Sequence, residues 1–174
     1  MKLIQEKRAY IEEYKKLSIF KFMSAAEILH IISESELILY SDSEKIVNQG
    51  DIAQNIQVIV NGTIQVTVRE ESGKEVYICS IEEGEIFGEA GMFLRVRRTA
   101  NIVSLDDSVI LSIPRSVLMN FIRDNPATGN KLLLVIIHSL LKKLRGTNQE
   151  LAFEKMVDVQ IDELDNLLAE LSDK

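Results

Sequence analysis

The chain has 174 residues, 46% of them hydrophobic, which is enough for one domain with a buried core and a few appended helices. Its formal net charge of −7 at pH 7 argues against DNA or RNA as the main partner, because nucleic-acid-binding domains present a basic surface. Cys79 is the only cysteine, which excludes an intrachain disulfide and any metal cluster held by several thiolates of one chain.

No segment of the sequence is predicted to enter a membrane. The N-terminal residues lack the apolar core of a signal peptide. The longest apolar run, KLLLVIIHSLLKKL (131–144), is too short to span a bilayer and is interrupted by the polar pair His138–Ser139. A cytoplasmic protein without membrane insertion is therefore expected.

Residues 1–35 are predicted to form N-terminal helices. Between residues 2 and 32 apolar side chains recur near one helical face, beginning with Leu3, Tyr10, Tyr14 and Leu17. Ser24 and Glu27 have the spacing of a capping box, in which the two side chains bond free N–H groups of the first helical turn. This spacing predicts a helix that begins after Ser24 and runs through Ile32.

Residues 36–113 change to the alternation that is typical of strands. Two such strands are marked by alternating apolar residues, namely Ile56, Val58 and Val60, then Ile64, Val66 and Val68. Asn61–Gly62, between them, is typical of a hairpin turn, and EESGKE (70–75) and DDS (106–108) indicate further turns. So many short strands predict an antiparallel barrel or sandwich.

Residues 114–155 are predicted to return to helices, and residues 156–174 to form an acidic helical tail. Asn125–Pro126 is typical of a helix start. Proline has no backbone N–H, and in the first turn of a helix this donor is not needed for a hydrogen bond within the helix. Beyond it, residues at alternating spacings of four and three form a coiled-coil seam of Leu133, Ile137, Leu140, Leu144, Thr147 and Leu151. A second seam, offset by one residue, runs from Val157 to Leu171.

The stretch GEIFGEAGMFLRVRRTA (84–100) gathers arginines beside Glu89 in an otherwise acidic chain. A glycine before a short helical turn lets the backbone approach a ligand and exposes N–H groups that favour an anion, which an arginine could also contact. Glu89 would repel a simple anion, but it could accept a hydroxyl proton from a ligand that carries both a phosphate and a hydroxyl. A 3′,5′-cyclic nucleotide, with its 2′-hydroxyl beside a compact phosphate, meets both requirements.

The sequence GEIFGEAGMF, followed by RRTA, resembles the phosphate-binding cassette of the cyclic nucleotide-binding domain. This family is shared by catabolite-activator-type regulators, regulatory subunits of cyclic-nucleotide-dependent kinases and gated channels. The resemblance extends from about Leu17 to Leu151. It implies a fold that is mainly β with flanking helices (α+β): an antiparallel β-roll or jelly-roll barrel, with N-terminal helices and a long C-terminal helix.

The resemblance also implies a set of ligand-binding residues. Gly88 and Ala90 would offer backbone donors or a close approach to the ligand. Glu89 would accept the ribose hydroxyl, Arg98 would pair with the cyclic phosphate, and Thr99 would donate its hydroxyl to the phosphate or the base. The complete set of candidates is Phe87, Gly88, Glu89, Ala90, Arg98, Thr99, Ala100, Thr147 and Asn148.

Thr147 and Asn148 belong to LKKLRGTNQELA (141–152), which resembles the stretch of the family's long helix that closes over the adenine. Thr147 interrupts a leucine seam, which a bond to the base would explain. Alternatively, Thr147 is a polar seam residue that fixes the register. The matched helix positions favour cyclic AMP, and Thr99 is compatible with cyclic GMP as well. No cofactor is expected besides this ligand.

Several individual residues have a simpler alternative role. Glu89 could form a surface pair with Arg97, which is otherwise expected to be a solvated loop residue. Cys79 alternates with hydrophobic neighbours and is expected in or near the core. Some family members bind heme or an iron–sulfur cluster, but Cys79, His30 and His138 share no evident site. No nucleophile–base pair stands out, so no enzymatic activity is expected.

Too few residues follow Leu151 for the DNA-reading domain of the family's transcription factors, and the acidic tail has the wrong sign for phosphates. We therefore expect a stand-alone sensor without DNA binding, which signals in trans to an unknown protein effector. The helix over residues 130–152 is expected to pair with its copy in a parallel homodimer; alternatively, its seam packs on the β-roll of its own chain. The alternative function is a structural or scaffolding protein whose cassette no longer binds, but retention of both Glu89 and Arg98 favours the sensor.

Overall fold

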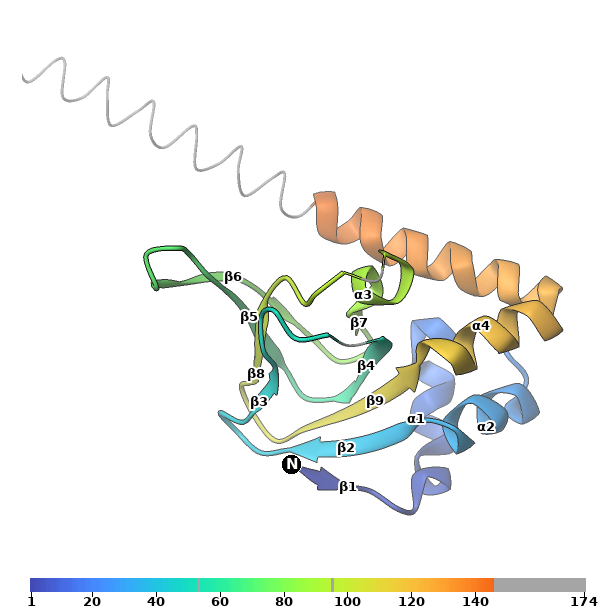
Figure 1. Cartoon of the computed structure of the whole chain (residues 1–174). Coiled ribbons are helices and arrows are strands. Elements are labelled where there is room, and N and C mark those ends of the chain that lie inside the picture. Colours follow the sequence, from blue (N-terminus) through green and yellow to red (C-terminus); the bar gives the residue numbers. More distant parts are fainter. Residues whose placement is uncertain (53, 95, 146–174) are drawn as a thin grey trace, which may run out of the picture. The chain divides into compact units, whose positions relative to one another are not determined.

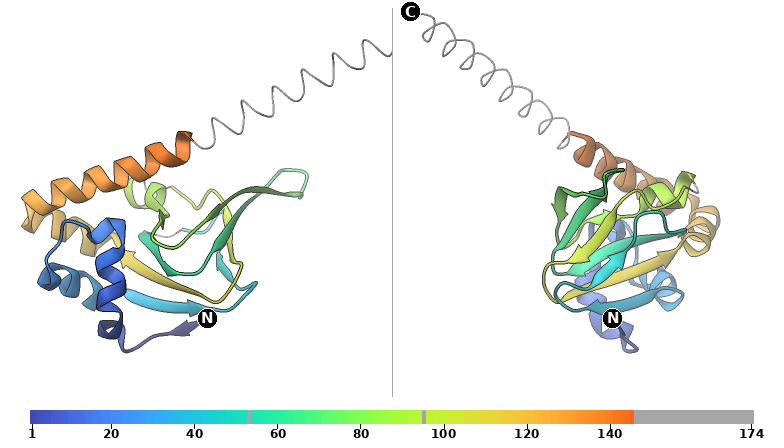
Figure 2. Two further views of the ribbon diagram at one scale, coloured as in Figure 1. Left: turned by 180° about the vertical axis from the view of Figure 1, so that it is seen from behind. Right: turned by 60° about the vertical axis from the view of Figure 1, so that its left-hand side comes forward.

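The computed structural model describes residues 1–52, 54–94 and 96–145, and the described residues fall into two units, one up to residue 136 and the other from residue 137. The first unit consists of two antiparallel sheets with helices α1, α2 and α4 at one end of the strands (Figures 1 and 2). This confirms the predicted class, mainly β with flanking helices, although the two sheets do not close into a barrel. Residues 137–145 of the second unit are helical. Among the described helices, none is both long and apolar enough to cross a membrane.

The N-terminal segment contains short helices and one short strand. Strand β1 (Lys2–Leu3) pairs with β2, so these two residues extend a sheet rather than a helix. The helices that follow are the 3-10 helix η1 (Lys7–Tyr10), α1 (Ile11–Lys16), the 3-10 helix η2 (Ser18–Phe20) and α2 (Ala25–Ser33). The predicted capping box of α2 is confirmed, since Ser24 Oγ accepts from Glu27 N–H and the Glu27 carboxylate accepts from Ser24 N–H.

The five-stranded sheet has the order β1-β2-β9-β4-β7, and the four-stranded sheet has the order β3-β8-β5-β6. Their remaining strands are β2 (Glu36–Tyr40), β3 (Lys45–Val47), β4 (Asn55–Asn61), β5 (Ile64–Arg69), β6 (Glu75–Ile81), β7 (Ile86–Phe87), β8 (Asn101–Ser104) and β9 (Ser108–Pro114). Helix α3 (Glu89–Leu94) lies between β7 and β8, and α4 (Arg115–Asp124) follows β9. The helix predicted at Asn125–Pro126 begins there, with Asn125 O accepting from Gly129 N–H at 2.7 Å.

Two turns carry the chain from one sheet to the other. The predicted hairpin at Asn61–Gly62 is wrong, because β4 belongs to the five-stranded sheet and β5 to the four-stranded sheet. The turn at residues 105–107 likewise joins β8 to β9 in the other sheet. The two turns are bound to each other, since Thr63 N–H donates to Asp106 Oδ1 at 2.9 Å. By contrast, residues 70–74 do close the antiparallel pair β5–β6.

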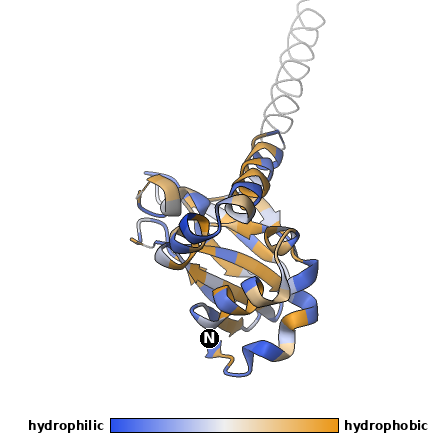
Figure 3. Ribbon diagram, turned by 90° about the vertical axis from the view of Figure 1, so that its right-hand side faces the viewer, coloured by the Kyte–Doolittle hydropathy of each residue, from blue (hydrophilic) through white to orange (hydrophobic). Residues whose placement is uncertain are grey.

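Apolar side chains form two buried clusters. Figure 3 shows that much of the length of the strands is coloured orange, for hydrophobic residues. The first cluster joins helices α1, α2 and α4 to the five-stranded sheet and includes Tyr14 and Phe121. The second draws on strands of both sheets and includes Ile64 and Phe87. Cys79 of β6 is half-buried and packs against the second cluster, which confirms the near-core position predicted for it.

Gly62→Ala is expected to destabilise the fold by about 2–4 kcal/mol, because backbone strain and overpacking add at this turn. Gly62 has a φ of +99°, and an added Cβ would lie 2.8 Å from Ser108 Cα. Gly73→Ala is the matched control, since Gly73 has a φ of +85° but nothing within 4 Å of the added Cβ. Urea denaturation measures both variants, and equal losses of stability would contradict the steric cause.

Candidate functional site

The cassette contains a tight turn between β7 and α3. Strand β7 pairs with β4 and ends at Phe87, and Gly88 then adopts a φ of +80°, after which α3 begins at Glu89. A side chain is disfavoured at Gly88 for two reasons: the positive φ, and an added Cβ that would collide with Nη1 of Arg98. The glycine predicted to allow a close backbone approach therefore lies directly against the predicted phosphate-binding arginine.

Glu89 and Arg98, the two charged candidates, are both buried, with exposed fractions of 5% and 8%. Burial lowers the pKa of Arg98 from its ordinary value, whereas the negative charges of Glu89 and Asp51 act in the opposite direction. Arginine keeps its charge under such conditions because its ordinary pKa is so high. A buried Glu89 does not fit the alternative of a solvated surface pair. Arg97 is exposed, as predicted, and its Nη1 donates to Gly50 O at 2.9 Å.

The guanidinium of Arg98 is held by three oxygen atoms. Its Nη1 donates to Gly88 O at 3.1 Å, and its Nη2 donates to Asn55 O at 3.1 Å and to Asn55 Oδ1 at 2.6 Å. Asn55 was not predicted from the sequence. It is separated from Arg98 by 43 residues, and nothing in the local pattern at the start of β4 indicates this contact.

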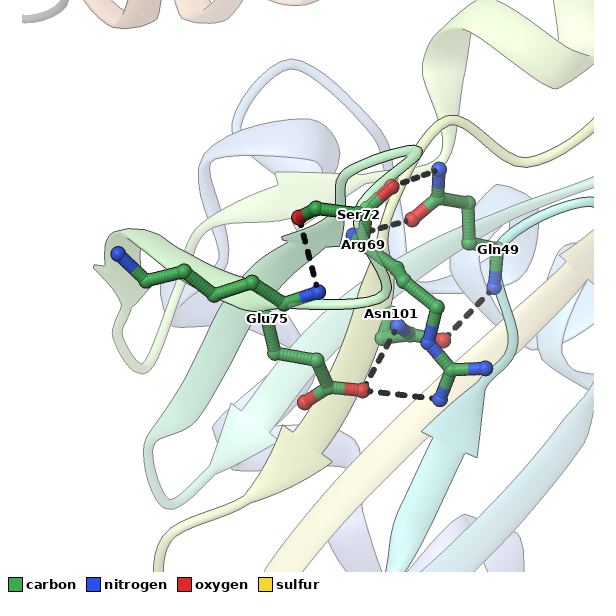
Figure 4. Close-up of polar contacts among 6 residues, drawn as sticks. Gln49, Arg69, Ser72, Glu75 and Asn101 are labelled. Carbon is green, nitrogen blue, oxygen red and sulfur yellow. Dashed lines mark hydrogen bonds and ion pairs between the residues drawn. The ribbon is translucent and has the colours of Figure 1, made fainter.

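The loop over residues 48–51 holds the backbone of Arg98. Gly50 N–H donates to Arg98 O, and Arg98 N–H donates to Asp51 O, both at 2.8 Å. Gln49 connects this loop to the end of β5 through two hydrogen bonds (Figure 4). Its Oε1 accepts from Arg69 N–H at 2.7 Å, and its Nε2 donates to Arg69 O at 3.3 Å. Gln49 was also not predicted, since its partners lie far away in the sequence.

Asn101 and Glu75 complete this polar network on the four-stranded sheet (Figure 4). Asn101 Oδ1 accepts from Gln49 N–H at 2.9 Å, and Glu75 Oε1 accepts from both Asn101 Nδ2 and Arg69 Nη2 at 3.3 Å. Asn101 is only 5% exposed and is the first residue of β8. The network therefore fixes the point at which the segment carrying Arg98 enters its sheet.

The remaining predicted ligand residues are placed differently from Glu89 and Arg98. Phe87 is buried in the second core cluster, whereas Ala90 and Thr99 are exposed and Ala100 is half-buried. Thr147 and Asn148 lie outside the described residues, as do Leu151 and the predicted acidic tail. The ligand contacts of these residues, like those of Gly88, Glu89 and Arg98, stay predictions.

A metal centre finds no support in the described ranges, where no group of three or more His, Cys, Asp or Glu side chains could hold an ion. His30 is exposed on α2, with Nε2 at 3.7 Å from an oxygen of Glu34. Cys79 lies on β6 of the four-stranded sheet, so the two residues do not share an element.

The fold thus places Gly88 against the buried guanidinium of Arg98, and Gly88 is followed directly by the buried Glu89. Residues 37–125 match the family profile of the cyclic nucleotide-binding domain. Because this match covers just over half of the 174 residues, the chain belongs to the cyclic nucleotide-binding domain family. The resemblance read from the cassette is thereby confirmed.

Known proteins with similar chains include both channels and regulators. A cyclic nucleotide-gated channel of Caenorhabditis elegans is 29% identical over an alignment of 142 residues, which covers 78% of this chain and 19% of the channel. The cAMP-activated global transcriptional regulator CRP of Pasteurella multocida is 25% identical over 129 residues, which are 74% of this chain and 60% of the regulator. The chain thus spans less than two thirds of either relative.

Among solved structures, a cyclic nucleotide-binding domain from Methylobacillus flagellatus has the same fold. It superposes with a TM-score of 0.77 at 19% sequence identity, over 86% of each chain. At this identity the likeness concerns the fold alone.

Proposed function

We propose that the protein is a sensor that binds cyclic AMP, or alternatively cyclic GMP, and acts on a protein effector in trans through rearrangement of its C-terminal helix. The observation that carries this proposal is the burial of Arg98 and Glu89 together beside Gly88. Arg98 can hold a cyclic phosphate through charge-assisted hydrogen bonds, and Glu89 can accept a 2′-hydroxyl proton. A scaffold would not require both buried charges, whose removal from water is costly.

The preference for cyclic AMP rests on Thr147 and Asn148, the positions expected beside the base. The CRP relative, which is named as cAMP-activated, supports the same choice. A binding role rather than a catalytic one is proposed, in keeping with a family that comprises sensors and regulators.

A homodimer through residues 130–152 is part of the proposal. In a single chain, Ile137, Leu140 and Leu144 of the predicted seam are 50%, 40% and 58% exposed. Apolar residues at this spacing would be covered by pairing with a second copy of the helix. Light scattering at high micromolar protein and saturating cyclic AMP should give twice the 19.7 kDa chain mass, and a monomer mass would exclude the dimer.

Calorimetric titration of ligand-stripped protein with cyclic AMP and cyclic GMP tests the proposed function. The parent protein should bind cyclic AMP more tightly than its 2′-deoxy analogue, because only the former offers a hydroxyl to Glu89. In Glu89→Ala the two ligands should bind with nearly equal affinity, since the hydroxyl has lost its acceptor. Absence of binding to either cyclic nucleotide would favour the scaffolding alternative.

A further inference from the structure

Arg98 uses only part of its donor set on the protein. A guanidinium carries five N–H groups and no acceptor. Its Nη2 carries two of them and has two acceptors, both on Asn55, while Nη1 has one acceptor, Gly88 O. Nε is buried and has no hydrogen-bond partner among the described residues. A buried N–H without a partner is unfavourable, so this donor indicates where an acceptor from a ligand is needed.

Asn55 is itself fixed at both ends of its carboxamide. Its Oδ1 must face Arg98, because the guanidinium can only donate. Its Nδ2 then points the other way and donates to Oγ of Ser112. Ser112 is 5% exposed and lies on β9, which pairs with β4 along the length of that strand. The orientation of the amide is therefore set by the sheet rather than by solvent.

We propose that Asn55 is a positioning residue for phosphate recognition, a role that rests on the proposed function of Arg98. By occupying Nη2, the carboxamide fixes the plane of the guanidinium and leaves the buried Nε–H for an oxygen of the cyclic phosphate. Asn55 thereby determines which donors Arg98 presents, and Ser112 keeps Asn55 in that orientation.

The test measures how Asn55→Ala changes the affinity for cyclic AMP and for adenosine, which has the same base and the same 2′-hydroxyl but no phosphate. We expect cyclic AMP to bind about tenfold more weakly, the loss that follows when a charge-assisted hydrogen bond is removed, and adenosine to bind as before. Ser112→Ala, which frees the amide but keeps Oδ1, should give a smaller loss with cyclic AMP only. Asn61→Ala, at the exposed far end of β4, is the matched control and should bind both ligands as the parent does.

A double-mutant cycle with Arg98→Ala separates this inference from the proposed function. If Asn55 acts through Arg98, Asn55→Ala should have no further effect in the Arg98→Ala background. An unchanged affinity of Arg98→Ala itself would remove the proposed function. The positioning role is overturned, and the proposed function stands, if Arg98→Ala weakens the binding of cyclic AMP while Asn55→Ala does not. The same conclusion follows if Asn55→Ala weakens the binding of adenosine as much as the binding of cyclic AMP. If Asn55→Ala does not fold, Ser112→Ala tests the positioning role in its place: a loss of affinity for cyclic AMP but not for adenosine supports the role, and no loss overturns it.

Discussion

Arg98→Ala should weaken the binding of cyclic AMP by about 10- to 100-fold, because hydrogen bonds to a charged group contribute about 1.5–3 kcal/mol. The variant also leaves Glu89 buried without the positive charge that interacts with it. Isothermal calorimetry with cyclic AMP measures the affinity directly. Arg98→Lys should recover only part of the loss, since an ammonium keeps the charge but not the planar fork.

Arg97→Ala is the matched control for this prediction. Arg97 has the same charge and adjoins Arg98, but it is exposed and contacts the backbone of the loop at Gly50. If net charge near the cassette governed binding, the two alanine variants would behave alike. A parent-like affinity of Arg98→Ala, in protein shown to be folded by circular dichroism, would remove the phosphate role.

Gly88→Ala is expected to weaken cyclic AMP binding at least about tenfold and to destabilise the protein by about 1–3 kcal/mol. The methyl group would occupy the space of Arg98 Nη1 and lie 3.1 Å from its Cζ, so the guanidinium must leave its present position. The positive φ of +80° adds backbone strain in any residue other than glycine. Calorimetry and urea denaturation measure the two effects separately.

Gly84→Ala distinguishes the steric contact from the strain. Gly84 has nearly the same φ, +84°, but an added Cβ meets nothing within 4 Å. Backbone strain should destabilise this variant by a similar amount, and the variant should still bind cyclic AMP normally. If Gly84→Ala weakened binding as much as Gly88→Ala, the contact with Arg98 could not be the cause.

The sequence was informative wherever the determinants lie close together along the chain. The capping box needs only Ser24 and Glu27, three residues apart, and the structure contains it. The cassette is similarly local, because a turn at Gly88 and a buried Glu89 follow directly from a short strand. Alternation of apolar residues also located the strands that contribute to the two cores.

The features that could not be predicted depend on contacts across long stretches of chain. Asn61–Gly62 specifies that the chain turns but not which strand becomes the partner, and here β4 and β5 enter different sheets. Asn55 meets Arg98 across 43 residues, so its role appears only once β4 and the cassette are placed side by side. Strand β1 is only two residues long, too short for alternation to show.

The amide of Gln49 has a consequence for how the protein avoids unwanted association. Strand β8 begins at Asn101, opposite Thr67, so the backbone of Arg69 extends past the last residue that β8 pairs with. Gln49 offers Arg69 one acceptor and one donor, as a neighbouring peptide group would. The Gln49 side chain thus occupies the backbone N–H and C=O of Arg69 at an exposed edge of the sheet. Unpaired backbone groups at such an edge can pair with an extended segment of another molecule, and this pairing is the usual starting point of β-aggregation.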